Sequence, residues 1–182
     1  YALRMLLFAV LSEVPFDLMY GGTVFYPVHQ NVIWTLLLGL LGIRLMEAAR
    51  AKGKRWLYIL TCAAVVVLGF ALGTLGMVDY YGAGVLTVFA FYFFRERKWW
   101  CLLGQLAALY WLNVVVLGGQ MYPVTLFGRE IELCEQGLAL LALVPIWLYR
   151  GRQGHHSKAF QYACYAFYPA HMLVLALLTM IQ

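Results

Sequence analysis

Long apolar segments separated by short charged or Gly- and Pro-containing connections limit how this chain can fold more than any other feature. A helix of about 20 apolar residues spans the hydrocarbon core of a bilayer, whereas the strands of a membrane β-barrel are shorter and alternate in polarity. The segments are near this helical length, which excludes the barrel. We expect membrane spans at residues 2–20, 31–50, 56–75, 78–94, 99–117, 131–149 and 159–181.

The composition agrees with a membrane protein. Of the 182 residues, 64 % are hydrophobic and only 12 % are charged, which is too little polar surface for a water-soluble globule. We therefore predict an all-α fold, a polytopic transmembrane helical bundle of about seven spans that forms a single domain over residues 1–182. The four cysteines lie far apart without a His at ligand spacing, so we predict neither a metal site nor a disulfide framework.

The basic residues predict the orientation of the spans. The positive-inside rule places connections rich in Lys and Arg in the cytoplasm, while the alternate connections here are acidic. This arrangement puts the C-terminus outside. It also accounts for the net charge of +5 without any nucleic-acid partner. Eleven of the 13 basic residues lie in or beside three alternate connections: Arg44, Arg50, Lys52, Lys54, Arg55, Arg95, Arg97, Lys98, Arg150, Arg152 and Lys158.

Ionisable residues inside spans are costly and are therefore candidates for function. Glu13 and Asp17 lie four residues apart in the first span, on one helix face, with Pro15 between them. His171 lies in the last span, two residues after Pro169. The alternatives are structural: the carboxylates could cap or pair within the bundle, and the imidazole could be a hydrogen-bonded packing residue.

A second group of polar residues lies at the outer ends of two spans. His29, Gln30 and Asn31 precede the second span, and Asp79 and Tyr80 open the fourth. Asn31 also suits a helix N-cap, and Asp79 could simply complement a helix dipole. With Glu13, Asp17 and His171, these residues predict a polar chamber that opens outward above a cytoplasmic surface that attracts anions.

Five stretches then point to a family: LRMLLFAVLSEVPFDL, HQNVIWTLLLGLL, VDYYGAGVLTVFAFYFFR, ALVPIWLYRGRQG and YACYAFYPAHMLVL. In this order they resemble the TraX family of bacterial inner-membrane proteins, relatives of the multi-span membrane acyltransferases. The resemblance implies a multi-pass inner-membrane acetyltransferase that uses acetyl-CoA as acyl donor. The best-known acceptor in the family is the N-terminal amine of conjugative pilin.

The family usually begins with two further spans, the first of which carries an Asp-His pair. No Asp-His pair occurs in these 182 residues. We therefore expect the sequence to be an N-terminally truncated part of a longer protein. Activity would then require the missing part, which would hold one catalytic group.

Acyl transfer needs a base, donors for the developing oxyanion and a site for the phosphates of CoA. We expect His171 or His29 to be the base, with Glu13 or Asp17 as its orienting carboxylate. Tyr168 or Asn31 would donate to the oxyanion. The substrate-binding candidates are Gln30, Asn31, Asp79, Tyr80 and Tyr168, and the phosphate-binding candidates are Arg95, Arg150 and Arg152.

The expected partners are membrane lipid and an acyl acceptor, either a pilin or another exported peptide or glycan. The alternative function is a non-enzymatic permease or assembly subunit, in which the same buried groups carry protons or a polar solute. Helices loosened at Pro15 and Pro169 would suit that function too. Acetyl transfer by the purified protein would separate the two.

Overall fold

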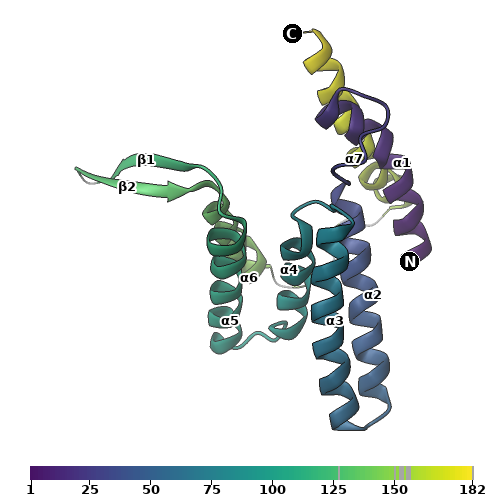
Figure 1. Ribbon diagram of the computed structural model, residues 1–182, viewed down its shortest axis with the longest axis vertical. Helices are drawn as coiled ribbons and strands as arrows, with labels where there is room; N and C mark the ends of the chain where they lie inside the picture. Colours follow the sequence, from purple (N-terminus) through teal and green to yellow (C-terminus); the bar gives the residue numbers. More distant parts are fainter. Residues whose placement is uncertain (127, 150, 152–153, 155–156, 182) are drawn as a thin grey trace. The chain divides into compact units, whose positions relative to one another are not determined.

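The computed structural model describes the chain except residues 127, 150, 152–153, 155–156 and 182. Within the described part, helices account for most of the chain, and one hairpin interrupts them (Figure 1). The chain divides into two compact units, residues 1–85 with 153–182 and residues 86–152.

Four helical segments are long and apolar enough to cross a membrane. They are α2 (Val32–Ala51), α3 (Arg55–Leu75), α5 (Trp99–Tyr110) with the π-helical segment η1 (Trp111–Leu117), and α7 (Lys158–Ile181), which qualifies over Lys158–Met180. These helices coincide with the predicted spans 31–50, 56–75, 99–117 and 159–181. The prediction of a mainly helical chain with helices able to cross a membrane is therefore confirmed for these four segments.

The first and fourth predicted spans are helical but differ from the other four. Helix α1 (Ala2–Gly21) has 20 residues and carries Glu13 and Asp17. Helix α4 (Tyr81–Phe93) has only 13 residues, because a turn takes up the start of the predicted segment 78–94. In that turn Met77 and Tyr80 have positive φ angles of 50° and 58°.

The sixth predicted span, 131–149, is wrong over its first residues. Met121–Leu126 and Arg129–Cys134 form antiparallel strands β1 and β2, and the 3-10 helix η2 (Glu135–Ala142) and α6 (Leu143–Leu148) follow. Charged and apolar residues alternate from Glu130 to Leu133, a period that suits a strand. Gly128, with φ of 75°, lies in the connection between the strands. The count of seven spans stays a prediction.

Each unit has its own packing. In the first, α1 packs against α7 and α2, and α2 packs against α3. In the second, α5 and η1 pack against η2. The Gln105 side chain ties the second unit together: its Nε2 donates to the Phe94 carbonyl at 2.8 Å and its Oε1 accepts from Trp147 Nε1 at 2.7 Å.

Candidate functional site

The candidate site lies in the first unit, where the N-terminal end of α2 meets α1, α7 and the turn between α3 and α4. This end of α2 and α3 is opposite the connection that holds Lys52 and Lys54. Polar residues from four separate parts of the sequence come together here: Glu13, His29 with Asn31, Asp79 and Tyr168.

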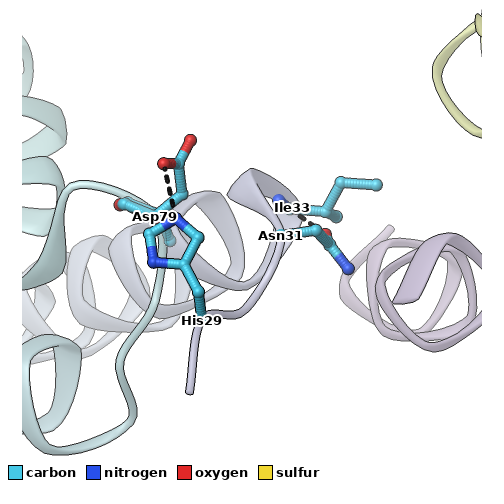
Figure 2. Close-up of polar contacts among 5 residues, drawn as sticks. His29, Asn31, Ile33 and Asp79 are labelled. Atoms are coloured by element: carbon cyan, nitrogen blue, oxygen red, sulfur yellow. Dashed lines mark hydrogen bonds and ion pairs between the residues drawn. The ribbon is translucent and has the colours of Figure 1, made fainter. Parts of the chain in front are cut away.

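Asn31 joins two helices. Its side chain is fully buried, and its Oδ1 accepts a hydrogen bond from the Ile33 backbone N–H at 3.0 Å, which makes Asn31 the N-cap of α2 (Figure 2). Its Nδ2 donates to the Ala9 carbonyl at 2.9 Å and to Glu13 Oε2. Since all of these groups are engaged within the protein, the helix-cap alternative is correct for this residue.

In each of the buried carboxyl groups of Glu13 and Asp17, only one of the two oxygens accepts a hydrogen bond from the described residues. Glu13 Oε2 also accepts from Trp34 Nε1 at 2.9 Å, and Asp17 Oδ2 accepts from the Tyr26 backbone N–H at 3.0 Å. Glu13 Oε1, Asp17 Oδ1 and the Ser12 hydroxyl are buried with no hydrogen-bond partner among the described residues. Buried oxygens without donors are costly, so this part of α1 suits a ligand or water that donates hydrogen bonds.

His29 pairs with a carboxylate from a distant part of the chain. Its Nε2 lies 3.3 Å from Asp79 Oδ1, and the side chains are 12 % and 24 % exposed (Figure 2). The imidazole stacks on Tyr20, with ring centroids 4.7 Å apart, and on Phe16 at 5.6 Å. The partner of His29 is thus Asp79, whereas the sequence suggested Glu13 or Asp17 as the orienting carboxylate.

The environment of Asp79 shifts its ionisation. Burial raises the pKa of this carboxyl above its ordinary value, and the nearby His29 opposes part of that rise. The Asp79 backbone is held as well, because its carbonyl accepts from the Thr35 hydroxyl at 2.8 Å. The sequence analysis did not identify Thr35 and Trp34 as residues of the site. The only sequence feature that could have indicated them is their position in the first turn of α2, next to the capping Asn31.

Gln30 holds the two loops of the site together. Its backbone N–H donates to the Met77 carbonyl at 2.8 Å, and its Nε2 donates to the Pro27 carbonyl at 3.1 Å. Its polar groups therefore serve loop structure. Tyr80, also a substrate-binding candidate, is 45 % exposed and begins the connection into α4.

Helix α7 contributes Tyr168 and His171. The Tyr168 side chain lies near the backbone of Val32 and within electrostatic reach of Asp79 and Glu13. His171 Nδ1 lies 2.9 Å from the Phe167 carbonyl, and its ring meets that of Tyr168 edge-on at 5.3 Å. Because a carbonyl only accepts, Nδ1 carries the hydrogen and Nε2 of the neutral ring remains an acceptor.

A shallow groove of about 190 Å³ lies beside this cluster, between α1, α7 and the first turns of α2. Its lining is mostly apolar and includes Met5, Phe8, Ile33 and Leu36, with Tyr168 among its walls and Arg4 as its charged residue. The groove therefore connects Tyr168 to the N-terminal part of α1.

The predicted phosphate-binding residues are placed only in part. The Arg95 guanidinium lies 4.8 Å from the centre of the Tyr92 ring, in the second unit. Arg150 and Arg152 lie outside the described residues. Among the residues that the structure does describe, no group of three His, Cys, Asp or Glu side chains is arranged to hold a metal ion.

Comparison with known proteins identifies the family. A family model described as TraX protein matches residues 1–179, almost the whole chain. The chain belongs to the TraX family. No curated protein and no solved structure matches it. Family membership and the apolar helices together make this TraX chain a helical membrane protein.

Proposed function

We propose that this TraX-family chain is a membrane-embedded acyltransferase that moves an acetyl group from cytoplasmic acetyl-CoA to an acceptor amine or hydroxyl at the outer side. The observation that carries the proposal is the His29–Asp79 pair, a partly buried imidazole held by a carboxylate. The acetylation implied by the family resemblance gives the pair a reaction to catalyse.

His29 is the better-supported base. An ionised Asp79 carboxylate accepts hydrogen bonds only, so the hydrogen between the two groups belongs to His29 Nε2. Nδ1 of the neutral ring then accepts the proton that the acceptor loses as it attacks the thioester carbonyl. The new bond to the acetyl carbon forms as the carbon–sulfur bond breaks, and CoA leaves as the thiolate. Asp79 stabilises the imidazolium that results.

Tyr168 is the better-supported oxyanion donor. Both hydrogens of the Asn31 amide are committed, to Ala9 and to Glu13. The Tyr168 side chain lies near the backbone of Val32, in the same cluster. A phenolic hydroxyl carries one hydrogen that it can donate to the developing oxyanion.

In this proposal the site lies in the outer half of the membrane, and acetyl-CoA enters from the cytoplasmic side. The cluster forms at the end of α2 that lies away from Lys52 and Lys54, and the positive-inside rule assigns that basic connection to the cytoplasm. We propose an inner-membrane location with the C-terminus outside. Arg95, Arg150 and Arg152 would hold the CoA phosphates at the cytoplasmic side.

The alternative, a permease or assembly subunit, is favoured by a different observation. Ser12, Glu13 and Asp17 each leave a buried oxygen without a described partner, and Pro15 interrupts the hydrogen bonds of the same helix. A path for protons or a small cation would need such oxygens. In that case acetyl-CoA would not be consumed.

The test is acetyl transfer from labelled acetyl-CoA by the intact protein in vesicles. We expect His29→Gln to lower kcat by about 10² to 10⁴, because Gln keeps a polar side chain but cannot accept the proton. The matched variant is His171→Gln, which should lose less because its imidazole has only a backbone carbonyl as described polar partner. Wild-type activity of His29→Gln would refute His29 as the base. Proton or cation flux without acetyl transfer would favour the permease.

A further inference from the structure

The hairpin formed by β1 and β2 has two chemically different faces. The register pairs Tyr122 with Leu133 and Val124 with Ile131, so these four side chains share one face. The opposite face presents Pro123 with Glu132 and Thr125 with Glu130. We call the first the apolar face of the hairpin and the second its acidic face.

The side chains of the apolar face are exposed among the described residues of the second unit. Tyr122, Val124, Ile131 and Leu133 are between 39 and 48 % exposed. A two-stranded hairpin on its own is marginally stable in water at best, because it has no second layer on which to bury its side chains. Something must therefore cover this face for the hairpin to persist.

The base of the hairpin is fixed to the end of a membrane span. Only residues 118–120 separate β1 from the end of the span Trp99–Leu117. The Glu135 backbone N–H donates to the Gln120 carbonyl at 3.0 Å, and Cys134 Sγ lies 3.3 Å from the Gly118 carbonyl. The hairpin thus emerges where the chain leaves the hydrocarbon core.

From this geometry we propose that the apolar face of the hairpin lies on the lipid surface at the outer boundary of the membrane. The open edges of a two-stranded sheet leave backbone groups unpaired, which excludes the hydrocarbon core but not the headgroup region. Tyr122 is a residue type that the headgroup region favours.

The charges agree with this lipid surface as the occupant. Arg129 shares the apolar face by strand alternation, where it meets lipid phosphates, while Glu130 and Glu132 point to the opposite side. A partner protein with a basic surface would instead meet the acidic face, and a second copy of the chain would bring two apolar faces together. Both remain distinguishable outcomes of the test.

The experiment places the photoreactive amino acid p-benzoylphenylalanine at neighbouring positions that point to opposite faces. The variants replace Val124 or Thr125 in β1, and Ile131 or Glu132 in β2, in the intact protein. Each is irradiated in vesicles of phosphatidylethanolamine and phosphatidylglycerol and in the membranes of the producing cells. Mass spectrometry then counts lipid and protein adducts.

We expect lipid adducts at positions 124 and 131 to exceed those at 125 and 132 several-fold. The alternation between neighbouring positions is the decisive signal, since a hairpin that merely moves near the membrane would label both faces. Equal lipid labelling on both faces would overturn the proposal. So would adducts at 124 and 131 that are mostly with a second copy of the chain or with another protein. The use of two strands keeps the test valid if one variant perturbs the fold.

Discussion

The type and position of Asn31 were enough to indicate one polar contact, the N-cap of α2. Asn31 stands directly before an apolar segment and caps it, as its short side chain and position indicate. The pairing of His29 with Asp79 could not be predicted, because 50 residues separate them and only the packing of α2 against α3 brings their loops together. The sequence suggested Glu13 or Asp17 as the orienting carboxylate of an imidazole, but both bind other groups.

Substitution of Asp79 separates a role in catalysis from a role in folding. We expect Asp79→Asn to lower kcat by at least about tenfold, because an amide does not stabilise an imidazolium as a carboxylate does. The melting temperature should hold or rise at neutral pH, because burial raises the pKa of Asp79 and an ionised carboxyl there costs stability.

The pH dependence has a definite sign. A carboxyl whose pKa is raised by folding favours the folded state at low pH, and this contribution is lost as the pH rises through the raised pKa. The stability of Asp79→Asn relative to wild type should therefore increase with pH, and this gain should vanish at a pH well below about 4, where Asp79 is protonated in both the folded and the unfolded wild type. Melting curves across this range, with Asp79→Glu as the conservative control for activity, check both effects. A parallel loss of kcat and stability would indicate a structural role.

Among the elements, the long helices were predictable and the hairpin was not. Hydropathy located α2, α3, α5 with η1, and α7 to within about two residues, because a span must satisfy its backbone within the helix. The same reasoning failed for residues 131–134, where hydropathy averaged over a window concealed an alternation of period two. The turn that shortens α4 depends on positive φ angles at Met77 and Tyr80, which are not glycines and gave no signal.

Gly84, in the first turn of α4, approaches Thr35 of α2 closely, and this contact can be tested by substitution. A Cβ added at Gly84 would lie 2.8 Å from the Asp79 carbonyl oxygen and 2.9 Å from Thr35 Cγ2. We expect Gly84→Ala to destabilise the protein by about 1–3 kcal/mol, because neither the turn nor the helix can yield freely. Gly154→Ala, at a position with open space around it, should leave the melting temperature unchanged.

A second substitution tests whether a clash with the Thr35 methyl group causes the loss of stability in Gly84→Ala. Thr35→Ser removes the methyl group in the way and retains the hydroxyl that binds the Asp79 carbonyl. In the Gly84→Ala background it should recover part of the lost stability, as expected for two residues that compete for one space. If Gly84→Ala is as stable as the wild type, the close approach of Gly84 to Thr35 is wrong.

For the whole molecule, the distribution of basic residues predicts which side of the membrane each connection lies on. This topology requires α4 to cross the membrane, although α4 is short. The basic connections alternate along the chain, but 13 residues of α-helix cover only about 20 Å of a core about 30 Å thick. The turn before α4 lies within the bundle and not beyond it: Gln30 and Thr35 bond to the carbonyls of Met77 and Asp79. A short helix that begins below the outer boundary can still reach the cytoplasm.

Whether α4 crosses the membrane determines on which side the following connections lie. Arg95, Arg97 and Lys98 follow α4, so we expect it to cross and to place them inside. Single cysteines at Lys54 and Gln120, in a background without the native cysteines, should then react with an impermeant thiol reagent from opposite sides. These positions avoid Gly53 and Gly119, whose positive φ angles would strain a cysteine. Between the two lie α3, α4 and α5 with η1, so three crossings separate them if α4 spans and two if it does not. Labelling of both from one side would put the basic residues after α4 outside. The hairpin would then lie at the cytoplasmic surface, away from the side proposed for acyl transfer.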